Sequence, residues 1–100
     1  MQIGIDLGAT KIESVLLDQN GSEVLRERNN TPKDYKETII SIVNIVKNIE
    51  KKFNKKFSVG ICHPGSTISE TGLIKNSNNS TWMNNKPFQK DISDELDRII

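Results

Sequence analysis

The chain has 100 residues, with 14 Lys or Arg, 13 Asp or Glu and a formal net charge of +1 at pH 7. This balance excludes the basic field that binds nucleic acid and the acidic tail that binds a basic partner, and no apolar run approaches the roughly 20 residues that cross a bilayer. One globular domain, or part of a larger one, is therefore expected, and a single cysteine without a secretion signal indicates a cytoplasmic protein with no nucleic-acid or membrane partner.

Apolar residues alternate with small or polar ones in the first predicted strand, from Ile3 to Leu7. This period of two is typical of a β-strand, and Gly8 interrupts it. A second apolar run, residues 11–18, follows after only a few residues. We therefore expect a hairpin whose loop lies at the end of the first strand.

The loop of this hairpin has the composition of an anion-binding site, with the residues Gly8, Ala9, Thr10 and Lys11. Small residues leave backbone N–H groups unobstructed, and the Thr10 hydroxyl and the Lys11 charge add further groups that attract an anion. Asp6 places a carboxylate beside that anion, which requires an intervening cation, and hydrated Mg²⁺ is the usual one. The pattern therefore predicts a loop for the phosphates of a magnesium-bound nucleotide.

Two better-known phosphate motifs are absent, because the loop lacks the spacing G-x-x-x-x-G-K-[ST] and no G-x-G-x-x-G leads from a strand into a helix. An ordinary hairpin remains the alternative interpretation. In it, Gly8 serves only the geometry of the turn and Asp6 caps the loop.

The next elements predict an antiparallel meander of three strands, then a helix and a parallel strand. Asn20-Gly21 is a preferred hairpin dipeptide, so a third strand, residues 22–28, should pair with the second. A fourth strand, residues 57–62, should return parallel to the first through a right-handed crossover. The expected fold class is α/β, the opening half of a ribonuclease-H-like fold, with the segment 63–66 beside the phosphate loop.

The helix between these strands begins by Tyr35, and either Thr31 or Asp34 can serve as its N-cap. An apolar stripe with helical spacing should bury one face of it. The stripe consists of Ile39, Ile40, Ile42, Val43, Ile45, Val46, Ile49 and Phe53.

The remaining residues predict shorter elements. An extended piece at 72–74 precedes an amide-rich loop, residues 75–88, which suits a ligand with several hydroxyl groups or is a plain surface loop. A last helix should start near Asp91 or Ser93, with an apolar stripe that is cut off at Ile100, so Ile99 and Ile100 are expected to be exposed. Cys62 is expected to be a buried strand residue, and His63 to lie at the edge of a cleft without a catalytic role.

Three motifs in this order resemble the ROK family of sugar kinases, and within it the bacterial fructokinase and mannokinase branch. They are Gly4 to Lys11, Gly60 to Gly65, and Gly72 to Asn79 with Trp82. The resemblance covers essentially the whole chain. It implies that residues 1–100 form the N-terminal lobe of an actin/hexokinase-like ATPase fold, and that the activity is ATP-dependent phosphorylation of a hexose by a fructokinase-like enzyme.

The resemblance also implies roles for particular residues. The nucleotide-binding residues would be Gly4, Asp6, Gly8, Ala9, Thr10 and Lys11. Asp6 would hold the Mg²⁺ of Mg-ATP through water, and the sugar would meet Gly65, Ser66 and Asn79, with Trp82 wedging the loop. Ala9 departs from the family, which has a second glycine there, and a left-handed backbone at Ala9 would cost about 1–2 kcal/mol.

The family's general base is an Asp in an Asn-Asp-Ala motif beyond Ile100, and its zinc-binding His and Cys cluster lies further on. The resemblance therefore implies no catalytic residue among these 100, an inactive isolated chain, and either a homo-oligomer or pairing with a C-terminal lobe. A non-catalytic remnant that binds a sugar or a partner without turnover is the alternative. A ROK-type repressor is disfavoured, because its DNA-binding motif would precede a loop that here begins at Gly4.

Overall fold

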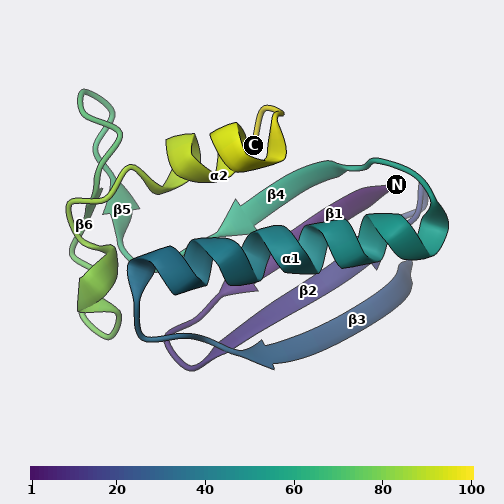
Figure 1. Ribbon diagram of the computed structural model, residues 1–100, viewed down its shortest axis with the longest axis horizontal. Coiled ribbons are helices and arrows are strands. Elements are labelled where there is room, and N and C mark those ends of the chain that lie inside the picture. The colour runs from purple at the N-terminus through teal and green to yellow at the C-terminus, as the bar shows by residue number, and fades with distance from the viewer.

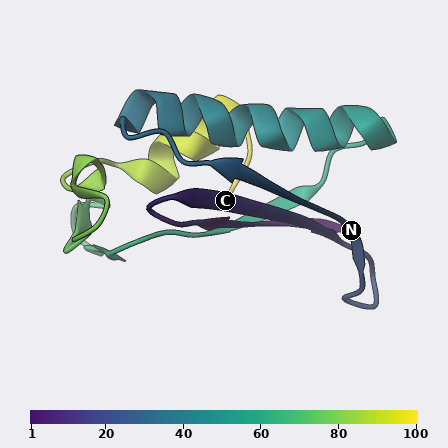
Figure 2. The same ribbon diagram turned by 90° about the horizontal axis from the view of Figure 1, so that it is seen from below.

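The computed structural model describes all 100 residues as a mixed sheet with both helices on one face (Figure 1). Figure 2 shows the opposite face of the sheet bare. The strands are β1 (Gln2–Leu7), β2 (Lys11–Leu17), β3 (Glu23–Asn30) and β4 (Ser58–Cys62). Their order is β3-β2-β1-β4, with β1 antiparallel to β2 and parallel to β4. The predicted meander and parallel return are confirmed.

The alternation in β1 decides which of its side chains enter the core. Ile3, Ile5 and Leu7 are buried, whereas Asp6 is exposed on the opposite face. Cys62 is the parallel neighbour of Asp6 and is exposed with it, so the expectation of a buried cysteine is wrong. The reason is that no element covers this face of the sheet.

Helix α1 (Tyr35–Phe53) is capped by Asp34, whose carboxylate accepts a hydrogen bond from the Glu37 N–H at 2.9 Å. Of the two N-caps that the sequence allowed, the structure therefore selects Asp34. The predicted stripe is buried except at Ile40 and Phe53, which are 42% and 39% exposed because they lie at its margins.

Helix α2 (Phe88–Leu96) begins three residues before the predicted start at Asp91. Pro87 precedes it without a side-chain capping bond, so its start carries no capping signal. Asp97 ends the helix with a left-handed φ of 53°. Beyond it Ile99 is 93% exposed, as expected, whereas Ile100 is partly buried against the core.

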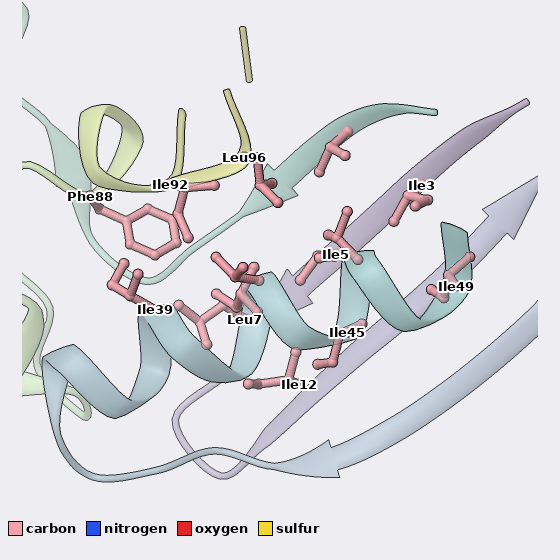
Figure 3. Packing of buried hydrophobic residues seen from close by; sticks show 14 of the residues in the cluster. Ile3, Ile5, Leu7, Ile12, Ile39, Ile45, Ile49, Phe88, Ile92 and Leu96 are labelled. Atoms are coloured by element: carbon pink, nitrogen blue, oxygen red, sulfur yellow. The ribbon is translucent and has the colours of Figure 1, made fainter. Parts of the chain in front are cut away.

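The core lies between the sheet and the two helices. Figure 3 shows side chains from β1, β2, α1 and α2 meeting in one layer. The labelled residues are Ile3, Ile5, Leu7, Ile12, Ile39, Ile45, Ile49, Phe88, Ile92 and Leu96, all of them buried. No helix in this fold combines the length and the apolar composition needed to span a membrane.

An ion pair fastens the C-terminal end of the chain to α1 and the start of β4. The Arg98 guanidinium donates to both oxygens of the Glu50 carboxylate and to the Phe57 carbonyl, and the Phe57 N–H donates to Glu50 at 2.8 Å. The Arg98 and Glu50 side chains are 17% and 10% exposed. Burial opposes ionisation of Glu50, but the hydrogen bonds from Arg98 and Phe57 outweigh it and lower the pKa of this carboxyl.

We expect Glu50→Gln to lower the free energy of unfolding by about 3 kcal/mol near pH 7, because it leaves the Arg98 guanidinium buried without its counter-charge. The pKa of Glu50 is lowered from its ordinary 4.5, so this contribution is present above that pH and is lost as the pH falls through the lowered value. Urea denaturation of chain and variant along a pH series measures the difference.

The control is Asp94→Asn, which removes an exposed ion pair with Lys90 and should leave stability nearly unchanged. A deficit of Glu50→Gln that stays constant down to strongly acidic pH would contradict the proposed charge effect.

Candidate functional site

Two predicted loops lie at the same edge of the sheet. Asp6 near the end of β1 is the parallel neighbour of Cys62 at the end of β4. The β1–β2 loop and the segment after β4 therefore start side by side, as Figure 1 shows at the arrowheads of these strands. The structure thus brings together the predicted phosphate loop and the predicted sugar segment.

The β1–β2 loop is a tight turn in which the Gly8 N–H donates to the Lys11 carbonyl at 2.9 Å. A Cβ atom on Gly8 would lie 3.0 Å from the same carbonyl oxygen, so any larger residue there would force this turn to shift by a few tenths of an ångström. Ala9 is not among the residues with positive φ. The replacement of the family's second glycine by Ala9 therefore carries no left-handed strain.

The turn presents free hydrogen-bond donors. No backbone carbonyl accepts a hydrogen bond from the N–H of Ala9 or Thr10. The carbonyls on either side are engaged instead, because Thr31 donates its hydroxyl to the Gly8 oxygen and its N–H to the Thr10 oxygen, both at 2.9 Å. Unpaired N–H groups at one turn are a site at which an anion can bind.

Asp6 supplies an unpaired carboxylate beside this turn. Its neighbour across the strands is Glu13, which is held by Arg28 at 2.8 Å and by Arg26 at 3.4 Å. Two adjacent carboxylates repel one another, and the arginines neutralise only Glu13. Asp6, which forms no ion pair with a basic side chain, is left to bind a cation.

The bare face near Asp6 is hollowed to a volume of about 530 Å³. Gly4 and Gly60 are parallel neighbours and both line this hollow, so no side chain fills its middle. Neither here nor elsewhere in the chain do three His, Cys, Asp or Glu side chains come close enough together to hold a metal ion by themselves. A lone carboxylate fits hydrated Mg²⁺, which usually keeps several water ligands.

Lys11 is exposed at the start of β2, and its ammonium donates to the Asn30 side chain across the β2–β3 pair. A phosphate would have to compete with this amide for the Lys11 charge. The assignment of Lys11 to nucleotide phosphates stays a prediction.

Gly65 and Ser66 lie where β5 (Ser66–Thr67) pairs with β6 (Ile74–Lys75). Gly65 has a φ of +74°, and a Cβ atom there would lie 2.4 Å from the Lys75 carbonyl oxygen. The close approach of its own chain thus explains the glycine at this position. Ser66 is exposed, and its role as a sugar contact stays a prediction.

His63 is anchored within this segment. Its Nδ1 lies 2.8 Å from the Pro64 carbonyl oxygen, its Nε2 lies 3.2 Å from the Thr67 hydroxyl, and its ring meets Phe88 edge-on. Both ring nitrogens are therefore engaged with the protein.

Asn79 is exposed at the tip of the loop after β6, as is its neighbour Asn78. The Asn84 side chain holds the base of this loop, accepting from the Ser77 N–H at 2.9 Å and donating to the Ser77 carbonyl at 3.2 Å. Trp82, in the short helix η1 (Thr81–Met83), packs partly against the core, which agrees with its expected role as a wedge. The loop is thus supported from below, with its amides facing outward.

Two features of this site are absent from the sequence interpretation. The sequence pattern indicates Thr31 only as an N-cap. It also does not reveal the Glu13 clamp, by which we mean the pairing of the Glu13 carboxylate with Arg26 and Arg28. Strand alternation carries a signal for the clamp, because pairing of β2 with β3 sets Glu13 opposite Arg28. Nothing local in the sequence links Thr31 to Gly8.

Comparison with known proteins agrees with this arrangement. A family model described as the ROK family matches residues 2–100. The chain belongs to the ROK family. This ROK chain is 39% identical over 101 residues to an N-acetyl-D-glucosamine kinase of Mannheimia succiniciproducens, a match that covers 100% of the chain and 33% of that kinase. It thus spans a third of this relative's length.

Solved structures confirm the predicted fold class. The ROK hexokinase from Thermus thermophilus matches with a TM-score of 0.82 at 20% identity, over 97% of this ROK chain and 32% of that one. A ROK family glucokinase from Streptomyces griseus, solved with glucose and AMPPNP, matches with the same TM-score and identity over 98% and 31%. The ROK chain thus has the actin/hexokinase-like ATPase fold. Because the relative named above is an N-acetyl-D-glucosamine kinase, the fructokinase-like assignment stays a prediction.

We expect Gly65→Ala to destabilise the chain more than Gly72→Ala does. Both glycines have positive φ, +74° and +72°, but a Cβ atom at Gly72 would meet nothing within 4 Å. Gly72→Ala should cost about 1 kcal/mol from backbone strain, and Gly65→Ala about 2 kcal/mol more from the clash with Lys75. Urea denaturation of both variants measures this difference, and equal losses would contradict the close packing of Gly65.

Proposed function

We propose that this chain is the N-terminal lobe of an ATP-dependent hexose kinase. The observation that carries the proposal is the β1–β2 turn, in which the N–H groups of Ala9 and Thr10 are free beside the unpaired carboxylate of Asp6. The relative and the structural neighbours described above, which are sugar kinases, support it.

The residues of the turn would bind and orient the nucleotide. The Ala9 and Thr10 N–H groups and the Thr10 hydroxyl would donate hydrogen bonds to phosphate oxygens, and Asp6 would hold the metal through its water ligands. Mg-ATP supplies the phosphoryl group and neutralises part of its charge. Gly4 and Gly8 would keep the approach to the turn free of side chains.

The sugar would lie against the neighbouring segments. The exposed Asn79 amide can both donate and accept hydrogen bonds, as a ring of hydroxyl groups requires, and the Ser66 hydroxyl and the backbone at Gly65 would add further contacts. The general base that deprotonates the acceptor hydroxyl would come from a C-terminal lobe, which this chain would need as its partner for turnover.

The acceptor is proposed to be a hexose, with two candidates. The resemblance to the fructokinase and mannokinase branch supports fructose, whereas the Mannheimia succiniciproducens relative, an N-acetyl-D-glucosamine kinase, supports N-acetylglucosamine. A comparison of sugars decides between them.

The test is a chimaera that joins residues 1–100 to the C-terminal two thirds of the Mannheimia succiniciproducens kinase. We expect ATP-dependent phosphorylation of fructose, glucose, mannose or N-acetylglucosamine, and no turnover by the 100 residues alone. The unmodified relative is the control for the assay. A folded chimaera that is inactive with every hexose would contradict the proposal. If calorimetry of that inactive protein showed sugar binding, the non-catalytic alternative would be favoured.

Within the active chimaera, Asp6→Asn should lower kcat/KM about 100-fold or more, because the metal loses the charge that orients it. Asp94→Asn, on the exposed side of α2, is the matched control and should retain full activity. Steady-state kinetics with varied ATP measures both, and a fully active Asp6→Asn variant would remove Asp6 from the nucleotide site.

A further inference from the structure

We propose that Thr31 is a positioning residue for the β1–β2 loop, which it holds with its N–H groups directed towards the nucleotide. The importance of this role for turnover rests on the kinase function proposed above. Thr31 follows β3 directly and is 9% exposed, so it lies beneath the loop and does not itself face a ligand.

Thr31 makes both of its hydrogen bonds to this loop. Its hydroxyl donates to the Gly8 carbonyl and its N–H donates to the Thr10 carbonyl, each at 2.9 Å. The two acceptors flank Ala9, so one residue grips the turn at two points, although it lies 23 positions from Gly8 in the sequence.

The geometry of the peptide group links the hydrogen bonds of Thr31 to the direction in which an N–H group of the turn points. In a planar trans peptide the C=O and N–H groups point in opposite directions. The Gly8 carbonyl belongs to the same peptide as the Ala9 N–H, one of the two free donors of the turn. When Thr31 draws this carbonyl inward, it turns the Ala9 N–H outward, as an anion would require, and its bond to the Thr10 carbonyl fixes the other end of the turn.

The anchor is itself rigid. Pro32 restricts the backbone of Thr31 to extended conformations. Thr38, fully buried in the first turn of α1, has its hydroxyl 3.2 Å from the Pro32 carbonyl and 2.7 Å from the Asp34 carbonyl. Capping of α1 is performed by Asp34, so the Thr31 hydroxyl is not needed there. The loop is thus tied to the packed end of a helix.

Amide hydrogen exchange, measured on the 100-residue chain without nucleotide, tests whether Thr31 holds the β1–β2 turn. We expect Thr31→Val to speed exchange of the Gly8 and Thr31 amides about tenfold, because one hydrogen bond holding the turn is lost, while amides in the middle of the β1–β4 pair stay within about twofold. Thr31→Ser keeps the hydroxyl and should restore slow exchange. Ser93→Ala is the control, since it removes a partly buried hydroxyl whose hydrogen bond, to the Arg98 carbonyl, lies in the C-terminal segment and not at the loop.

Steady-state kinetics of the chimaera test whether this positioning of the turn affects the use of ATP. Thr31→Val should raise the KM for ATP about fivefold and leave the KM for the hexose within about twofold, with Thr31→Ser close to the parent. Unchanged exchange of the Gly8 amide in Thr31→Val, or an equal increase in Ser93→Ala, would overturn the proposal. An inactive parent chimaera with the expected exchange pattern would instead count against the kinase function alone.

Discussion

Strand β1 is paired along both of its edges, antiparallel with β2 and parallel with β4, and the candidate site depends on this double pairing. Antiparallel pairing with β2 requires the tight β1–β2 turn, which contains the free N–H groups of Ala9 and Thr10. The parallel edge makes β4 end beside the same turn, so the segment from His63 to Ser66 begins where the nucleotide phosphates are proposed to lie. A phosphoryl donor and an acceptor hydroxyl must be held close together, and strands that end at one edge provide that proximity.

The two faces of the sheet have different physical roles. One face of β1 and β2 is aliphatic and packs against α1 and α2, which stabilises the fold. The other carries Asp6, the Glu13 clamp and the two facing glycines Gly4 and Gly60, and it is left bare. Because side chains alternate along a strand, each strand can supply the core and the site at the same time.

The loops of the site are held in place by residues distant from them in the chain. Thr31 holds the β1–β2 turn from the end of β3, Lys75 packs on Gly65 from β6, and Asn84 supports Ser77 beneath the loop that carries Asn79. The Arg98–Glu50 pair likewise ties the C-terminal end to α1. Such supports leave the polar groups at the loop tips exposed while their backbone is fixed, which is the arrangement that preorganised binding requires.

The sequence by itself determined the strands of the four-stranded sheet, α1, the parallel return of β4, the family and the composition of the phosphate loop, because these follow from local periodicity and from motifs within a few residues. Tertiary structure alone decided the rest. It chose Asp34 over Thr31 as the cap, exposed Cys62, paired β5 with β6, started α2 at Phe88 and gave Gly65 its packing partner. Each of these outcomes depends on which distant segment, if any, lies against the residue. A pattern read along the chain contains the propensity of a segment but not the identity of its neighbour in space.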